Sequence, residues 1–415
     1  MTVDSRITHI IEEARRRGAP HWAWLVARGP VVITTLGITT LALVAQYGAM
    51  THETPSPQRS AERFEALHAK LEVPDPRGRI RPPPAFVKGI YVSAQMAGTK
   101  NLFQKVVGLV ERTEINTMVI DVKDGSGALA FIPKDPALAD HALVKPLIPD
   151  LAAFTKPLRD KGIWLVARIF VFQDPAYVKL HPEVALKSKA TGAIWRDRKG
   201  IPWVDPAHHE AWEYAAAIAK EAYEGGFDEV QFDYIRFPTD GAMSDIRYPV
   251  YDATTTTKAQ NMEQFFSFLD DRLGGLGLKT SVDLFGLVMW THDYDLNIGQ
   301  RLDIAAPHFD YISPMVYPSH YPPGFDGHAN PAEFPYEVIL RNMQRGMPLI
   351  AKLREDHPAA RIASIRPWIQ DFDLGADYTA DMVRAQMKAA VDGGASGWLL
   401  WNARNSYTED ALNKK

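Results

Sequence analysis

Short apolar runs alternate with helical stretches from residue 86 to the C-terminus. Most of these runs are apolar at nearly every position, which is typical of parallel strands covered on both faces. Between several runs, apolar residues recur at helical spacing, as at Trp212, Ala215, Ala219 and Ala222, before Gly225-Gly226 ends the pattern. Eight strands are predicted, at Gly89–Ala94, Thr117–Lys123, Ile163–Phe172, Glu229–Phe237, Lys279–Gly286, Tyr311–Pro318, Arg361–Ile369 and Gly397–Trp401.

Eight strand–helix units within about 325 residues predict an α/β fold, a (β/α)8 TIM barrel over residues 86–410. An open, doubly wound sheet is the alternative, but no G-x-G-x-x-G motif opens a helix in this sequence. In barrels of this kind, the functional residues lie at the C-terminal ends of the strands. The informative positions are therefore those where an apolar run stops and polar groups begin.

The first 85 residues have a different character. Pro30–Tyr47 carries no charge, and Arg15, Arg16, Arg17 and Arg28 precede it. A membrane-spanning helix needs roughly 20 apolar residues. The positive-inside rule then predicts a cytoplasmic basic tail over residues 1–29 and a transmembrane signal-anchor over residues 30–49. A cleaved signal peptide and a buried core helix are the alternatives.

Residues 50–85 are rich in proline, which predicts a stiff linker between the anchor and the barrel. An arm packed against the barrel is the alternative. With the basic tail in the cytoplasm, the linker would hold the barrel outside it, at the outer surface of the inner membrane.

Composition narrows the function classes. The 46 Lys+Arg and 50 Asp+Glu residues give a net charge of −4, which argues against a nucleic-acid partner. The absence of cysteine excludes disulfides, thiol nucleophiles and Cys-ligated metals. No Walker loop, G-x-S-x-G elbow or H-E-x-x-H motif occurs, so we expect neither a cofactor nor a metal. The oligomeric state is not predicted.

Acidic residues stand at the ends of four predicted strands, namely Asp121, Asp233, Asp283 and Asp371. Side chains of a strand alternate between its two faces, so Asp233 should face the barrel mouth while Phe232 and Tyr234 pack outward under helices. The same alternation places Asp283 inward. An ion pair with Arg236 is the non-catalytic interpretation of Asp233.

On the second strand, the turn signal Asp124-Gly125 favours Asp121 inward and Asp124 on the loop. Two inward carboxylates are what glycoside hydrolysis requires. One protonates the leaving oxygen, and the other attacks the anomeric carbon or activates water. The predicted catalytic residues are Asp233, Asp283 and Asp121.

Aromatic, basic and polar side chains near the strand ends could hold a sugar substrate by stacking or hydrogen bonding. After the sixth strand, Tyr317, His320 and Tyr321 are expected to form one wall of the substrate cleft. The predicted substrate-binding residues are Tyr91, Arg168, Trp203, Arg236, Tyr317, His320, Trp368, Asp371 and Trp401.

The segment Gly226–Pro238 reads GFDEVQFDYIRFP and closely resembles the core motif of the bacterial glycosyl hydrolase-like family DUF4015. The stretches KGIYV, IDVKD, WVDP and ISPMVYPSHY, from Lys88, Ile120, Trp203 and Ile312, resemble other parts of this family in the same order. The resemblance covers roughly residues 86–405 and implies a TIM barrel akin to those of glycoside hydrolases. This sequence has Gly125-Ser126-Gly127 where the family pattern leads us to expect a further acidic residue.

Together, these features predict a membrane-anchored glycoside hydrolase that cleaves a polysaccharide or oligosaccharide outside the cytoplasm. A non-catalytic glycan-binding barrel of an envelope assembly is one alternative. A metal-assisted polysaccharide deacetylase is another, disfavoured by the small number of histidines at strand ends. A barrel fold alone does not decide among them.

Overall fold

The structure, a computed structural model, describes residues 81–142 and 145–415. The predicted basic tail, the predicted signal-anchor and most of the predicted linker lie outside the described residues. Within the part of the chain that is described, no helix is both long and apolar enough to span a bilayer.

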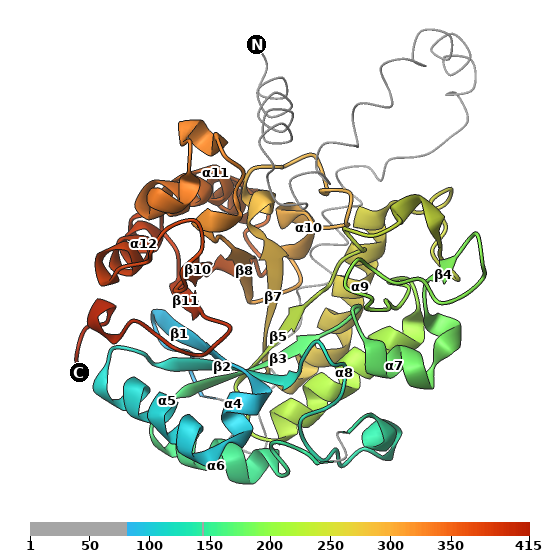
Figure 1. The fold of residues 1–415 in the computed structure, drawn as a ribbon, viewed down its shortest axis with the longest axis horizontal. Coiled ribbons are helices and arrows are strands. Elements are labelled where there is room, and N and C mark those ends of the chain that lie inside the picture. The colour runs from blue at the N-terminus through green and yellow to red at the C-terminus, as the bar shows by residue number, and fades with distance from the viewer. Residues whose placement is uncertain (1–80, 143–144) are drawn as a thin grey trace, which may run out of the picture.

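Parallel strands close into a barrel with helices around it (Figure 1). The first strand, β1, pairs with the last, β11, and Trp368 of β10 pairs with Met315 of β8, which completes the ring. The predicted (β/α)8 barrel is therefore confirmed. Its eight staves are β1 (Val87–Val92), β2 (Thr117–Lys123), β3 (Trp164–Phe170), β5 (Glu229–Asp233), β7 (Lys279–Phe285), β8 (Tyr311–Met315), β9 (Ser364–Ile365) together with β10 (Trp368–Gln370), and β11 (Gly397–Trp401).

The seventh stave differs from the prediction of one continuous strand over Arg361–Ile369. It consists of β9 and β10, separated by Arg366 and Pro367. Proline has no N–H to donate to a neighbouring strand, so the ladder is interrupted there. On either side of the break, β9 pairs with β8, and β10 pairs mainly with β11.

The helices around the barrel begin and end at recognisable signals. Asp150 caps α6 by accepting from the N–H of Ala153, and Thr257 and Gln260 form a capping box at the start of α9. Helix α8 ends before Gly225-Gly226, as predicted, and Gly226 has a φ of 93°. The helices are α4 (Ala94–Gly98), α5 (Lys100–Arg112), α6 (Leu151–Asp160), α7 (Pro175–Leu180), α8 (His209–Glu224), α9 (Lys258–Leu273), α10 (Leu302–Ala305), α11 (Pro335–Asp356) and α12 (Ala380–Asp392).

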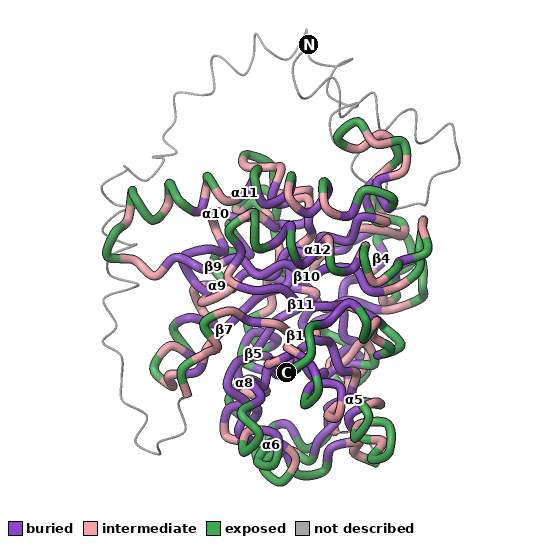
Figure 2. Tube along the Cα trace, turned by 90° about the vertical axis from the view of Figure 1, so that its left-hand side faces the viewer, coloured by how far each residue is buried: buried purple, intermediate pink, exposed green. Residues whose placement is uncertain are grey.

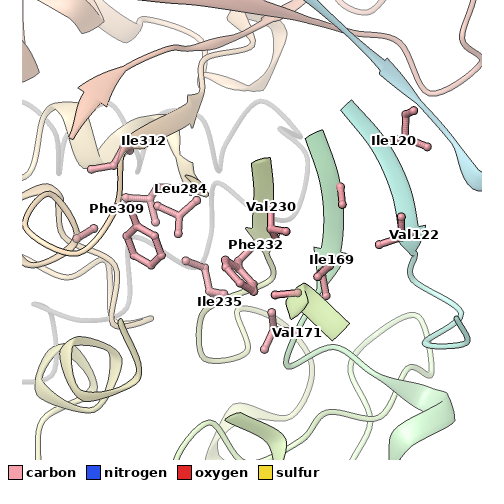
Figure 3. Close-up of a cluster of buried hydrophobic side chains, with 14 of the residues drawn as sticks. Ile120, Val122, Ile169, Val171, Val230, Phe232, Ile235, Leu284, Phe309 and Ile312 are labelled. Carbon is pink, nitrogen blue, oxygen red and sulfur yellow. The ribbon is translucent and has the colours of Figure 1, made fainter. Parts of the chain in front are cut away.

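The apolar core lies between the barrel wall and the helices. The staves are buried along most of their length, and exposed residues lie on the outer helices and loops (Figure 2). Figure 3 shows part of this layer, in which Val230 and Phe232 of β5 lie near Ile169 of β3. Phe232 therefore packs outward as predicted. Outside the barrel, the short strands β4 (Lys187–Ser188) and β6 (Ile246–Arg247) form an antiparallel pair.

The inside of the barrel is charged at its lower end, near the strand N-termini. Glu229 of β5 and Arg366 form a fully buried ion pair. The indole N–H of Trp164 donates to Glu229 Oε2 at 3.0 Å, and the Ser281 hydroxyl donates to Oε1 at 2.5 Å. These bonds satisfy a charge that would otherwise be costly to bury. They fill the bottom of the barrel and leave its upper end for other groups.

Candidate active site

Four charged side chains from neighbouring staves meet inside the upper barrel. Asp121 and Arg168 are direct partners in the register of β2 and β3. Asp233 is the last residue of β5, and Asp283 lies two residues before the end of β7. All three acids face the barrel interior, as the strand alternation predicted.

Arg168 binds all three carboxyl groups through different nitrogens. Its Nη1 donates to Asp121 Oδ1 at 2.8 Å, and its Nε donates to Asp283 Oδ2 at 3.1 Å. Its Nη2 donates to Asp233 Oδ2. Nε and Nη2 lie on the same edge of the guanidinium, so Asp233 and Asp283 are close neighbours. The ion pair with Arg236 considered for Asp233 is replaced by one with Arg168.

The remaining carboxyl oxygens have neutral donors. The Tyr91 hydroxyl donates to Asp121 Oδ2 at 2.6 Å, and the indole N–H of Trp368 donates to Asp283 Oδ1 at 2.7 Å. The N–H of Tyr234 donates to Asp233 Oδ1 at 2.6 Å. Tyr91 and Trp368, both predicted to contact substrate, therefore also hold the acids in place.

One guanidinium charge cannot balance three carboxylates in a buried site. Burial, followed by the charge of Asp233, raises the pKa of Asp283 to about 8. Burial also raises the pKa of Asp121, to about 6, although Arg168 and Tyr91 oppose the rise. The raised pKa of Asp283 favours its protonated form at neutral pH.

Aromatic rings surround the guanidinium of Arg168. The Trp401 ring stacks on Tyr91 with 4.1 Å between ring centroids and stands perpendicular to Trp368 at 5.5 Å. Arg168 lies 5.0 Å from the Trp401 ring and 4.7 Å from the Phe170 ring. Trp401 is among the predicted substrate-binding residues, but Phe170 is not. An extended strand turns residues 168 and 170 to the same face, so alternation counted from Arg168 could have identified Phe170.

Tyr234 does not pack outward, contrary to the sequence prediction. The strand ends at Asp233, and Tyr234 adopts a φ of 54°, which is rare for a residue other than glycine. Its ring instead stacks on Phe170, with centroids 4.4 Å apart. Side-chain alternation fails here because it holds only while the backbone is extended. Such backbone strain is often found at functional sites.

The loop after β8 divides into two parts. His320 is exposed, and its ring lies edge-on to Tyr317, with centroids 5.2 Å apart. The Tyr317 ring in turn lies 6.5 Å from Trp401, which links this loop to the rings around Arg168. Tyr321, however, is buried and donates its hydroxyl to Asn342 of α11 at 2.9 Å. Tyr317 and His320 therefore lie beside the rings around Arg168, whereas Tyr321 is directed towards α11.

Arg236 and Trp203 lie together in the loops above β5. The Arg236 guanidinium is 4.9 Å from the Trp203 ring. Trp203 is buried and donates its indole N–H to Asp197 Oδ2 at 3.0 Å, so it supports Arg236 from below the surface.

Asp371, one of the predicted substrate-binding residues, lies at the end of β10 and contacts Thr408. Its carboxyl group accepts from the hydroxyl of Thr408 at 2.7 Å and from the N–H of Thr408 at 3.0 Å. It thereby fixes the segment that follows β11. Asp124 lies in a turn and accepts from the N–H of Ser126 at 2.9 Å, as predicted.

Across residues 81–142 and 145–415, no three His, Cys, Asp or Glu side chains are grouped so that they could hold a metal ion. The cation among the three acids is the guanidinium of Arg168.

Solved structures share the fold. The glycoside hydrolase domain of PgaB (BpsB) from Bordetella bronchiseptica aligns with 76% of this chain and 94% of its own, at 13% identity and a TM-score of 0.54. Alpha-L-fucosidase isoenzyme 2 from Paenibacillus thiaminolyticus aligns with 79% of this chain and 48% of its own, at 13% identity and a TM-score of 0.51. At such identities the likeness shows the fold alone.

A hypothetical protein from Ruminiclostridium thermocellum is 32% identical over 46% of this chain and 96% of its own, with a TM-score of 0.41. No curated protein matches the sequence. The family model described as "Putative glycosyl hydrolase domain" (DUF4015) matches residues 89–407, which include every acid and every aromatic ring of the site described above. The chain therefore belongs to this glycosyl hydrolase family.

Proposed function

We propose that the protein hydrolyses glycosidic bonds with Asp233 and Asp283 as its two catalytic carboxyl groups. The observation that carries the proposal is that these acids share one edge of a guanidinium while the pKa of Asp283 is raised to about 8. One group then holds a proton at neutral pH and the other supplies a carboxylate. Acid and base side by side are what cleavage of a glycosidic bond needs.

In the first step, Asp233 attacks the anomeric carbon as the bond to the leaving oxygen breaks, and Asp283 gives its proton to that oxygen. In the second, water attacks the glycosyl–Asp233 ester, returns a proton to Asp283 and frees Asp233. Arg168 holds both acids throughout. Asp121 and Tyr91 bind the other side of Arg168 and fix its orientation.

The proposed mechanism retains the anomeric configuration. Inverting enzymes leave roughly 6.5–9.5 Å between their carboxyl groups for a water molecule, whereas retaining enzymes have about 5–5.5 Å. Two acids on one edge of the same guanidinium fit the shorter spacing. Proton NMR of the first-formed product should show the anomer of the substrate, and the opposite anomer would exclude Asp233 as nucleophile.

The substrate proposed is a polysaccharide outside the cytoplasm. Support comes from the uncharged segment at residues 30–49 with basic residues before it. Flat sugar faces would stack on the rings at the barrel mouth, where Tyr234 and Trp401 are each partly exposed.

Replacement of Asp233 by asparagine tests the proposal. Asp233→Asn keeps the size of the side chain but removes the nucleophile, so reducing-end release from a polysaccharide panel should fall by about 10²–10⁴-fold or more. Thermal unfolding should confirm that the variant folds. Asp124→Asn, in the turn after β2, is the matched control and should keep full activity. Near-native turnover by Asp233→Asn would leave Asp233 as a structural partner of Arg168.

A non-catalytic glycan-binding barrel is the second candidate, because the acids are enclosed as well as paired. Asp233 is only 4% exposed and Asp283 only 1%. If the wild-type chain binds a polysaccharide of the panel and releases no reducing ends from any of them, this candidate replaces hydrolysis.

A further inference from the structure

Arg236 differs from the other buried arginines of the structure. Arg168, Arg236 and Arg366 are buried among the residues described, with exposed fractions of 3%, 8% and 0%. Arg168 binds three carboxyl groups and Arg366 binds Glu229. Within residues 81–142 and 145–415, no carboxylate lies within ion-pair distance of Arg236. A buried charge without a counter-charge is costly and points to a partner that arrives from outside.

The guanidinium of Arg236 sits in a cage of three rings. It lies 4.9 Å from Trp203, 5.1 Å from Tyr234 and 4.9 Å from Phe285. The rings stabilise the positive charge but accept no hydrogen bonds in the plane of the guanidinium. They hold the planar group in one orientation and leave its N–H edge to another ligand.

The protein uses only one nitrogen of this guanidinium. Nη1 donates to the carbonyl of Phe237 at 3.2 Å and to the Thr239 hydroxyl at 3.3 Å, both neutral acceptors. Among the described residues, Nε and Nη2 have no hydrogen-bond acceptor. Neither nitrogen is among the buried atoms that lack a partner, so both remain accessible to solvent. This free edge matches the two oxygens of a carboxylate.

Nearby acids do not fill that role. Asp197 accepts hydrogen bonds from Gln173 and Trp203, and Asp240 accepts from the N–H of Arg198. Asp233, Asp240 and Asp197 all oppose the lowering of the pKa of Arg236 by burial. None of the three comes within ion-pair distance of Arg236, and Asp233 is held by Arg168 and by the N–H of Tyr234.

The cage lies beside the acids of the upper barrel. Arg236 follows Asp233 by three residues, and Phe285 follows Asp283 by two at the end of β7. Tyr234 belongs to both groups, since it bonds Asp233 through its N–H and faces Arg236 with its ring. An anion bound by Arg236 would therefore be part of a sugar next to the bond being cleaved.

We propose that Arg236 recognises an oxyanion on the substrate, a carboxylate of an acidic sugar, so that the protein acts on an anionic polysaccharide. This inference rests on the proposed function and adds the substrate class to it. A sulfate group offers the same charge with a different geometry, so the test includes both.

The test uses the full-length chain and compares its action on polymers that differ only in charge. Polygalacturonate is paired with its carboxyl-reduced form, and dextran sulfate with dextran. Binding is measured by affinity electrophoresis and cleavage by reducing-end release. The wild-type chain should bind a carboxylated polymer about tenfold to hundredfold more tightly than its reduced form. High salt should narrow the difference. If the wild-type chain prefers only dextran sulfate over its neutral partner, the group that Arg236 recognises is a sulfate and not a carboxylate.

Variants separate charge recognition from folding. Arg236→Gln should lose the preference for the charged polymer, with a higher KM for that polymer and little change in kcat. Arg236→Lys should recover part of the preference, because it keeps the charge without the two-pronged edge. Arg404→Gln, which removes an exposed arginine from the loop after β11, is the matched control and should change nothing.

Failure of this inference and failure of the proposed function give different results. If the wild-type chain cleaves none of the polymers, the proposed hydrolysis of these polymers is excluded. The binding comparison then still decides whether Arg236 recognises an anion. If charged and neutral polymers bind equally, or if Arg236→Gln weakens both to the same extent, recognition of an anion by Arg236 is wrong. The comparison of the wild-type chain on paired polymers holds even if Arg236→Gln does not fold.

Discussion

At the scale of single residues, the charge at the top of the barrel is balanced by protons as well as by Arg168. The folded protein raises the pKa of Asp283 from an ordinary value near 3.8 to about 8, through burial and the charge of Asp233. The unfolded chain releases this proton above about pH 4, but the folded chain keeps it up to about pH 8. The folded state therefore binds more protons in this window, and its stability falls as pH rises from 4 to 8.

Asp283→Asn should remove much of that dependence, because asparagine resembles the protonated acid and never ionises. We expect the thermal midpoint of the variant to fall less than that of the wild type between pH 5 and pH 8, measured by circular dichroism. Asp121, whose pKa is raised to about 6, stays in both proteins and leaves a smaller decline. Asp124→Asn, which leaves Asp283 in place and removes only the smallest of the influences on the pKa of Asp121, should keep most of the wild-type decline. A variant curve parallel to the wild-type one would mean that Asp283 is ionised throughout this range.

The sequence was sufficient to predict that Asp121, Asp233 and Asp283 face inward, because alternation is a local property of a strand. It could not predict that Arg168 joins them. Arg168 meets these acids across 47, 65 and 115 residues of sequence, and which strands lie side by side is decided by ring closure. The local alternative, Arg236, was three residues from Asp233 and turned out to lie in the ring cage instead.

At the scale of elements, the apolar runs of the sequence were sufficient to predict where the strands lie, but they did not predict where a strand is interrupted. The seventh stave breaks where Arg366 turns into the barrel to meet Glu229, a partner 137 residues away. The short strands β4 and β6 also escaped prediction, since two residues are too few for a hydrophobic pattern to register.

The loop after β8 offers an element-level prediction, because two neighbouring rings on it have different surroundings. His320 is exposed beside Tyr317 and Phe372, so His320→Ala should weaken substrate binding or turnover with little change in thermal midpoint. Tyr321→Phe removes a buried hydrogen bond to Asn342 and should cost about 1 kcal/mol of stability with activity kept. Activity assays and thermal unfolding on both variants check this. A sharp loss of stability in His320→Ala would make the histidine structural.

At the scale of the whole molecule, we propose that residues 30–49 anchor the barrel in the membrane. The full-length chain should then stay with membranes through high-salt and carbonate washes, because a spanning helix is released only by detergent. A chain that begins at Arg81 should be recovered in the soluble fraction. Immunoblots of both fractions decide this. Soluble native protein cut near Ala45 or Ala49 would instead indicate a cleaved signal peptide.

The pairing of β1 with β11 also affects how the protein is made. A chain emerging from the ribosome cannot close its ring until residues 397–401 have been synthesised, because they lie between β10 and β1. Until then, two strand edges remain open to other chains, and Arg168 and its acids remain in contact with water. Chains that stop before Gly397 cannot close the barrel, and we therefore expect proteases to degrade them faster than the full-length chain.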